Sequence, residues 1–390
     1  MDRRIAHLDM DAFYASVELL RYPQLKGWAV VVGGARGPGP DPNVHLQDFA
    51  RLRNYVGRGV ATTASYEARA LGVHSAMGLM KAAALAPDAI LLPPDFDEYR
   101  RYSRVFKAAV AEIAPHIEDR GIDEIYIDLT DVPDETVELA QRIKDNVRLA
   151  TGLSCSIGIT PNKLLAKIAS ELDKPNGLTV LTFADLHTRV WPLPARKING
   201  VGPKASLKLE TLGIKTIGEL AQAPVALLVQ HFGIHYGQWL VAAANGRDEC
   251  PVVTESEPKS ISRETTFERD LDPRRDRDAL SRILVSLCED LSQDLNRKGY
   301  QGRTIGVKLR FDDFRIVTRD KTLASSINDL QTILGTVRDC LKRVPLDRKL
   351  RLLGVRAASL SRPGCFDSAA KTDSVSVNEN VPGKNLRLFD

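Results

Sequence analysis

The chain has 390 residues, of which 43% are hydrophobic and 27% are charged, ordinary values that exclude a collagen-like or wholly disordered chain. Its 54 basic and 50 acidic side chains leave a formal charge of +4, too small an excess to identify a partner. No apolar run approaches the ~20 residues of a membrane span, and carboxylates come too early for a signal peptide. Five scattered cysteines without a C-x-x-C pair predict reduced thiols in the cytoplasm and no zinc module.

The first half of the chain alternates short apolar runs with helical patterns. Residues 5–10 read as a buried strand that ends on carboxylates, and residues 13–20 fit a helix. Residues 34–59 open with a Pro- and Gly-rich run, which predicts a surface loop or a disordered insertion. The alternation as a whole predicts an α/β or α+β domain. Further strands are expected at 60–64, 89–92, 124–129, 154–160 and 178–181, and helices at 99–114, 135–150 and 162–172.

The second half of the chain divides into three kinds of sequence. The strand signal disappears over residues 183–247, where short helical segments predict a small all-helical domain. Residues 251–259 are polar and bounded by prolines, which is typical of a linker. The pattern over 260–362 is strand, helix, two strands, helix and strand, which predicts a two-layer β-α-β-β-α-β domain. Residues 363–390 contain few large apolar side chains and are expected to be a disordered tail.

Two pairs of carboxylates stand at predicted strand ends. Asp9 and Asp11 follow the first apolar strand, and Asp123 and Glu124 open a later one. If these strands are neighbours, the clustered carboxylates would repel one another unless a cation neutralises them. Oxygen ligands suit Mg²⁺, and two such ions ~4 Å apart would fit an in-line displacement at phosphorus. On spacing alone, turn caps and surface carboxylates are an equally good interpretation.

These carboxylates belong to a longer series of motifs. The segment Asp9–Glu18 is followed in order by Tyr66–Arg69, Gly121–Asp128, Ser156–Ile159, Ala166–Ala169, Lys174–Gly177 and Gly306–Phe314. Together the motifs resemble the Y-family translesion DNA polymerases, and most closely their bacterial DNA polymerase IV, or DinB, branch. The resemblance covers about residues 3–362.

The resemblance implies a right-hand polymerase of the α+β multidomain class. It has a ferredoxin-like palm, small fingers, a helical thumb with a helix-hairpin-helix, and a β-α-β-β-α-β little finger. The implied boundaries are a palm at 1–11 and 94–185, fingers at 12–93 with the insertion at about 34–59, a thumb at 186–250, a linker at 251–259, a little finger at 260–362 and a tail at 363–390.

The resemblance also implies roles for the carboxylates. Asp9, Asp123 and Glu124 would be catalytic and would hold two Mg²⁺ ions. The backbone carbonyl of Met10 would be a further metal ligand. Asp11 matches a second acidic position that lies outside this core set, so we expect it to act as a supporting residue.

The expected nucleotide site combines aromatic and cationic side chains. By resemblance, Tyr14 is the steric gate whose ring excludes a 2′-hydroxyl, and Phe13 packs beneath the nucleotide. An arginine fork or a lysine suits phosphate contact. No Walker-type motif is present, which disfavours a P-loop NTPase. The resemblance assigns the dNTP triphosphate to Thr63, Tyr66, Arg69 and Lys174.

Two regions are expected to hold primer-template DNA. Gly200, Gly202 and Lys204 resemble a helix-hairpin-helix turn, in which backbone N–H groups contact a phosphate without reading bases. A plain interhelical turn is the alternative. Residues 259–362 carry 23 basic and 15 acidic side chains, a net charge of +8, so the rest of the chain sums to −4. The strand residues expected to line the DNA face are Arg263, Lys308, Arg310 and Arg315.

The C-terminus ends in an apolar cluster after the polar tail. It resembles the peptide by which bacterial polymerases bind the sliding clamp, with Leu386, Leu388 and Phe389 as anchors. Asn385 stands where that pattern has Gln, a departure that would weaken the first contact.

The whole resemblance implies an error-prone, template-directed DNA polymerase for translesion synthesis. It would add dNTPs to a primer opposite damaged template by a two-metal mechanism, without proofreading, as a cytoplasmic monomer. The alternatives are a UmuC-like relative, a nucleotidyl cyclase and a non-catalytic DNA-structure binder. The basic C-terminal domain disfavours the cyclase, and the three intact carboxylates disfavour the binder.

Overall fold

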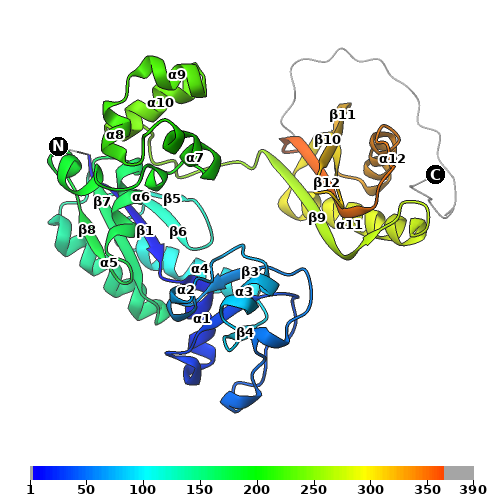
Figure 1. Cartoon of the computed structure of the whole chain (residues 1–390), viewed down its shortest axis with the longest axis horizontal. Coiled ribbons are helices and arrows are strands. Elements are labelled where there is room, and N and C mark those ends of the chain that lie inside the picture. The colour runs from blue at the N-terminus through cyan, green and yellow to red at the C-terminus, as the bar shows by residue number, and fades with distance from the viewer. Residues whose placement is uncertain (1–2, 364–390) are drawn as a thin grey trace. The chain divides into compact units, whose positions relative to one another are not determined.

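The structure is a computed structural model that describes residues 3–363. The chain forms two compact units, and it passes from one to the other between Glu255 and Ser256, inside the predicted linker. The predicted clamp-binding residues lie outside the described residues. Among the helices described, none combines the length and apolar character that crossing a membrane requires. Figure 1 shows the elements of each unit.

The first unit is built around a five-stranded sheet with the order β5-β6-β1-β7-β8. The central strand β1 (Ile5–Met10) is antiparallel to both β6 (Glu124–Asp128) and β7 (Cys155–Thr160). The edge strands are β5 (Ile117–Asp119) and β8 (Leu178–Val180), and β8 is parallel to β7. The two acidic strands are therefore neighbours, which was the condition for their carboxylates to cluster.

Helices cover both faces of this sheet (Figure 1). On one face, α4 (Phe96–Ala111) and α5 (Thr136–Thr151) share a hydrophobic core with alternate residues of the central strands. On the other face lies α6 (Lys163–Leu172). A Cβ atom at Gly158 would lie 2.5 Å from the carbonyl oxygen of Ala166, so the glycine allows α6 to pack directly on the strands.

A three-stranded sheet with the order β3-β2-β4 forms a second core in the first unit. Its strands are short, and each contains a β-branched Val, Thr or Ile, residues that favour strand structure. The middle strand was not among those expected from the sequence. The elements are β2 (Val30–Gly33), β3 (Ala61–Ala64) and β4 (Ile90–Leu92), with α1 (Phe13–Arg21), α2 (Tyr66–Ala70) and α3 (Leu79–Leu85).

The segment 34–59 contains two 3₁₀ turns, Leu46–Asp48 and Leu52–Asn54. Phe49 is buried in the core of the five-stranded sheet, and Leu52 is buried in the core of the three-stranded one. Two apolar anchors in separate cores fix the path of the segment. The expectation of a disordered insertion is thus wrong, and the surface-loop interpretation holds only outside these anchors.

The last part of the first unit is helical, as the sequence predicts. Its apolar side chains, including Leu209 and Leu240, form one core. Glycine and proline punctuate the connections: Gly202 precedes one helix, and Gly233 joins two others. The helices are α7 (Pro203–Thr211), α8 (Ile217–Gln222), α9 (Val225–Phe232) and α10 (Ile234–Ala244).

The second unit is a four-stranded antiparallel sheet with two helices on one face. The order β11-β10-β12-β9 and the chain order of the elements match the predicted β-α-β-β-α-β pattern. Along β10, Ile305, Val307 and Leu309 are buried toward the helices, so the alternate residues line the other face. The elements are β9 (Ser260–Leu271), α11 (Arg277–Lys298), β10 (Gln301–Phe311), β11 (Ile316–Ile327), α12 (Leu330–Leu341) and β12 (Leu350–Ser361).

Both ends of the predicted linker are held. On the first unit, Glu118 accepts a hydrogen bond from the Val253 N–H at 2.8 Å. Lys163 forms an ion pair with Glu118 at 2.5 Å and donates to the carbonyl of Pro251 at 3.1 Å. On the second unit, Glu257 forms an ion pair with Arg362 at 2.8 Å.

Candidate active site

The central strands bring the three predicted catalytic carboxylates to one end of the sheet. Asp9 lies directly opposite Glu124 in the β1–β6 pair. The Met10 N–H donates to the carbonyl oxygen of Asp123 at 3.0 Å. Residues about 115 positions apart in the sequence are therefore neighbours. Pairing of the hydrophobic strands brings them together, although the negative charges of the carboxylates repel one another.

The electrostatics of two of these carboxylates indicate crowded negative charge. Burial raises the pKa of Asp9, and the charge of Asp123 adds to that rise against the opposing charge of Lys174. Burial likewise raises the pKa of Asp123, with a further contribution from Glu124. A cation placed among these oxygens would relieve the repulsion.

Glu124 has the opposite shift. Its hydrogen bond to His7 and its ion pair with Lys167 lower its pKa to about 2, against the effect of burial. The two atoms His7 Nε2 and Glu124 Oε2 are 3.4 Å apart. The other ring nitrogen, His7 Nδ1, lies 2.8 Å from the Ser170 hydroxyl, so α6 orients the imidazole.

Two lysines supply countercharge to the carboxylates. Lys174 Nζ donates to Asp9 Oδ1 at 2.5 Å and also pairs with Glu171 at 2.5 Å. Lys167 pairs with Glu124. Within residues 3–363, no three His, Cys, Asp or Glu side chains are grouped as a ready metal site. The carboxylates nevertheless fit a hard divalent cation, because all their ligand atoms are oxygens. Burial and mutual repulsion also raise the pKa values of Asp9 and Asp123, and a cation would relieve that repulsion.

Asp11 is buried, and both of its carboxylate oxygens accept hydrogen bonds. Its two carboxylate oxygens accept hydrogen bonds from the hydroxyls of Ser154 and Ser156 and from the Asn176 N–H, each at 2.8 Å. These bonds tie the end of β1 to β7 and to the turn that follows Lys174. Asp11 therefore positions the site and has no free oxygen directed at a metal.

A buried lysine that was not predicted from the sequence also links β7 to the turn that follows Lys174. Lys144 Nζ donates to the carbonyl of Cys155 at 2.6 Å, to the carbonyl of Asn176 at 3.0 Å and to that of Gly177 at 3.1 Å. Burial lowers its pKa. The sequence feature that could have identified Lys144 is its position beside Ile143 on the apolar face of α5. A lysine is rarely buried there unless it has a specific partner.

The aromatic residues of α1 have different surroundings. The Tyr14 ring stacks on Tyr99, with centroids 4.2 Å apart and planes at 22°, and meets the edge of Phe96 at 6.0 Å. The Phe13 ring is buried in the main core, 6.2 Å from Phe106. Tyr14 alone of the two presents its ring at the surface, so a contact of Phe13 with a nucleotide would have to come from its backbone.

Three of the four predicted phosphate contacts, Thr63, Tyr66 and Arg69, lie on β3 and α2. The Arg69 guanidinium lies 5.1 Å from the Tyr66 ring centroid, and its Nε donates to the carbonyl of Ala64. The Tyr66 hydroxyl is buried and has no hydrogen-bond partner among the described residues. Burial and the charge of Asp11 raise its pKa to about 12. Thr63 is buried on β3. An orphaned donor beside an arginine suits an anionic ligand.

The predicted helix-hairpin-helix turn has the backbone that its glycines suggested. Gly200 has φ +110°, and a Cβ atom there would lie 2.6 Å from the Trp239 ring. The Tyr236 hydroxyl donates to the carbonyl of Gly200 at 2.8 Å. Gly202 precedes α7 with open space around it, and Lys204 is exposed in the first turn. The turn thus presents backbone N–H groups and one cation to solvent.

Two of the four basic residues expected to face DNA make contacts within the second unit. Arg263 lies opposite Val355, a core residue, and its guanidinium pairs with Asp294 of α11 at 2.5 Å. The Arg315 guanidinium lies 4.7 Å from the ring centroid of the buried Phe311. For Arg263 the prediction that it lines the open face is wrong, because its register with Val355 places it on the helix side of the sheet. Arg315 lies in the turn before β11, so no strand register assigns it to a face.

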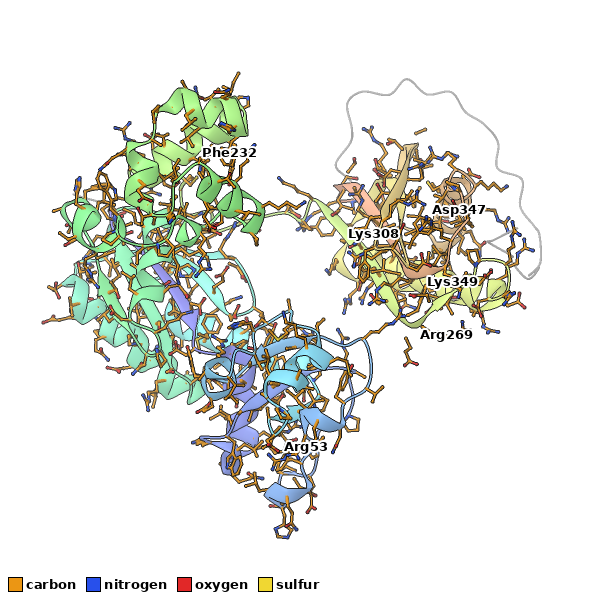
Figure 2. All side chains as sticks on the ribbon, in the orientation of Figure 1. Arg53, Phe232, Arg269, Lys308, Asp347 and Lys349 are labelled. Carbon is orange, nitrogen blue, oxygen red and sulfur yellow. The ribbon has the colours of Figure 1, made fainter. Side chains whose placement is uncertain are left out.

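Lys308 and Arg310 do lie on the open face of the sheet; Figure 2 labels Lys308 on its strand. Lys308 pairs with Glu264 at 2.7 Å, across Gly354 of the strand between them. The missing side chain leaves room for the pair, since a Cβ at Gly354 would lie 2.9 Å from that of Glu264. The Nε–H of Arg310 is buried and lacks a hydrogen-bond partner in the described part of the chain.

Comparison with known proteins identifies the family. The chain matches the impB/mucB/samB family over residues 8–171, the C-terminal domain of that family over 258–370, and the thumb domain of DNA polymerase-iota over 196–248. The chain is 39% identical to a DNA polymerase IV of Alkalilimnicola ehrlichii over 362 residues, which covers 92% of this chain and 95% of that protein. The chain belongs to the Y family of DNA polymerases.

Other relatives agree with this assignment. A DNA polymerase IV of Neisseria meningitidis is 38% identical, covering 92% of this chain and 96% of the relative. A solved Y-family DNA polymerase chimera of Dbh and Dpo4 superposes with a TM-score of 0.76 at 27% identity, covering 91% and 98% of the two chains. The five-stranded sheet is accordingly the palm of a right-hand, DNA-directed DNA polymerase, α7–α10 form the thumb, and the second unit is the little finger. Membership of this family implies the use of a divalent metal ion.

Proposed function

We propose that this polymerase extends a DNA primer opposite damaged template bases. The primer 3′-hydroxyl attacks the α-phosphorus of a dNTP, the bond from the α-phosphorus to the bridging oxygen breaks, and pyrophosphate leaves. The observation that carries the proposal is the convergence of Asp9, Asp123 and Glu124 at one end of the palm sheet. The many relatives that carry the name DNA polymerase IV support it.

Asp9, Asp123, Glu124 and the Met10 carbonyl would hold two Mg²⁺ ions. When bound, the ions would stabilise the charge that develops on the attacking and leaving oxygens. Lys174 Nζ pairs with Asp9 Oδ1 at 2.5 Å. A metal ion held by Asp9 would supply positive charge at the same carboxylate, and the flexible stem of Lys174 would allow its ammonium group to contact the triphosphate.

The remaining nucleotide contacts follow from the groups on the fingers. The Tyr66 hydroxyl donates to no other group in the described part of the chain, and the Arg69 guanidinium has a geometry suited to phosphate. Together with Thr63 they would hold the triphosphate. The ring of Tyr14 would lie under the sugar and exclude a 2′-hydroxyl, and Phe13 would contribute its backbone.

The DNA contacts would be made by backbone N–H groups at Gly200 and Gly202, with Lys204, Lys308 and Arg310 on phosphates. Such contacts are independent of sequence, which suits a polymerase. We further propose that the enzyme lacks proofreading, acts as a monomer in the cytoplasm, and binds the sliding clamp through its C-terminal peptide.

Primer extension with Mg²⁺ tests the site. The double variant Asp123→Ala, Glu124→Ala should lose roughly 1,000-fold or more in extension rate, because metal charge stabilisation is worth several kcal/mol. Asp128→Ala is the matched control, since Asp128 lies on the same strand but accepts a hydrogen bond from the Thr130 N–H at 3.0 Å. Extension by the double variant at the wild-type rate would refute the assignment.

A further inference from the structure

A buried carboxyl lies behind the ring proposed as the steric gate. Tyr14 and Glu18 are four residues apart on α1 and therefore share one face of the helix. Tyr99 of α4 lies between them: its ring stacks on Tyr14 at 4.2 Å, and its hydroxyl donates to Glu18 Oε1 at 2.5 Å. Glu18 is 3% exposed and Tyr99 is fully buried.

This arrangement differs from ordinary core packing. Burial raises the pKa of Glu18, and the hydrogen bond from Tyr99 opposes that rise. A buried carboxyl is unfavourable unless it is hydrogen-bonded, so the bond to Tyr99 is needed for Glu18 to be tolerated. An apolar side chain would fill the same space without that cost. The polar pair therefore adds something that packing alone does not supply.

What it adds is a fixed position for the Tyr99 ring. Stacking alone holds a ring in place only weakly, because ring pairs occur over a range of centroid distances and offsets. A hydrogen bond at the hydroxyl end fixes the ring along its long axis, since its strength falls steeply with distance and angle. Tyr99 thereby becomes a rigid support on which the Tyr14 ring rests, with Phe96 against its edge.

We propose that Glu18 and Tyr99 are positioning residues that set the sugar selectivity of the polymerase by holding the Tyr14 ring in place. The inference rests on the proposed role of Tyr14. A steric gate discriminates by a clash with the 2′-hydroxyl, and a misplacement of about 1 Å can change a rate by roughly 100-fold. A ring that can retreat onto a loosened support would admit a ribonucleotide.

The test compares single-nucleotide insertion of a dNTP and the matching rNTP by the full-length enzyme on a primer-template. Glu18→Leu removes the acceptor, Tyr99→Phe removes the donor, and Glu18→Gln keeps an acceptor oxygen. We expect Glu18→Leu and Tyr99→Phe to raise the rNTP to dNTP ratio of kcat/KM about tenfold, with dNTP insertion within roughly threefold of wild type. Glu18→Gln should retain the wild-type ratio.

Stability is separated from positioning by the double variant Glu18→Leu, Tyr99→Phe. Removing both partners leaves no buried group unsatisfied, so its melting temperature should exceed that of Tyr99→Phe alone. Its selectivity should stay impaired, because the ring is still not held. A double variant with wild-type selectivity would overturn the inference.

The Tyr14→Ala variant distinguishes failure of this inference from failure of the proposed gate. If Tyr14→Ala leaves the ratio unchanged, Tyr14 is not the gate and both proposals fail. If Tyr14→Ala raises the ratio while Glu18→Leu and Tyr99→Phe do not, the gate stands and the positioning role is refuted. Adding Glu18→Leu to Tyr14→Ala should cause no further change in the ratio, since the supported ring is gone.

Discussion

A one-residue step along a strand decides which basic side chains of the little finger face the open side of its sheet. Arg263 pairs in register with a core residue and reaches Asp294 of α11, whereas Arg310 alternates with core residues and emerges on the opposite face. Both are arginines on long strands of one positively charged domain. The positive charge of an arginine therefore does not by itself make it a candidate for DNA contact. The strand register shows which arginines lie on the open face of the sheet.

This difference gives a matched pair of variants. Arg310→Ala should weaken binding of primer-template DNA and reduce the slope of log affinity against log salt by about one phosphate contact. Arg263→Ala should leave that slope unchanged, because its guanidinium is paired with Asp294 under the sheet. Fluorescence anisotropy with labelled DNA over a salt series measures both. A smaller slope for Arg263→Ala and not for Arg310→Ala would reverse the assignment.

The part of the candidate site that could be predicted from the sequence is the set of carboxylates at the ends of strands. Asp9, Asp123 and Glu124 stand at the ends of hydrophobic strands, and strand pairing alone brings them together. Lys144 and Glu18 were not identified, because their roles depend on partners 32 and 81 residues away. No local pattern encodes such partners; only a polar residue in an apolar stripe hints that one exists.

Element prediction succeeded where the hydrophobic pattern is long. The helices α5 and α6 were expected within one residue of their observed bounds, and the order of strands and helices in the second unit was expected as observed. The strand β5 was missed because only one of its three residues, Ile117, is apolar, so it carries no strand pattern. The segment 34–59 was misread because two buried residues inside a Gly- and Pro-rich run carry too little signal.

We expect the residue before α11, Asp276, to contribute to the stability of the fold in a pH-dependent way. Asp276, the residue before the helix, accepts hydrogen bonds from Arg269, labelled in Figure 2, and from the Asp272 N–H at 2.8 Å. These bonds lower the pKa of Asp276 from 3.8 to about 2. A lowered folded-state pKa gives stability that is complete above pH 3.8 and is lost as the pH falls toward 2.

Melting curves of wild type and Asp276→Asn between pH 7 and pH 2 measure this contribution. The variant should melt at a lower temperature at pH 7, and the difference should shrink below about pH 4 as Asp276 takes up a proton. Asp278→Asn, at an exposed position in the first turn of the same helix, controls for loss of charge near the helix start. A difference for Asp276→Asn that is constant down to pH 2 would contradict the assignment.

At the scale of the whole molecule, the proposed clamp peptide makes a separable prediction. Deleting residues 385–390 should abolish stimulation by the bacterial sliding clamp, because tethering raises the local enzyme concentration at the primer end. Extension without the clamp should be unchanged, since the palm carboxylates are untouched. A scrambled version of the same six residues is the control for chain length. Equal stimulation of the deleted and intact enzymes would remove the peptide from this role.

The anchored linker has a consequence for how the little finger engages DNA. Val253 is fixed on the palm unit and Glu257 on the little finger, so only three residues separate the anchor points, a reach of roughly 14 Å. If the little finger binds the duplex as proposed, a tether this short leaves little conformational entropy to lose in that second contact. The second contact is then effectively intramolecular, at a high effective concentration. Lengthening the connection would lower the effective concentration of the little finger near the DNA without changing any residue proposed to contact it.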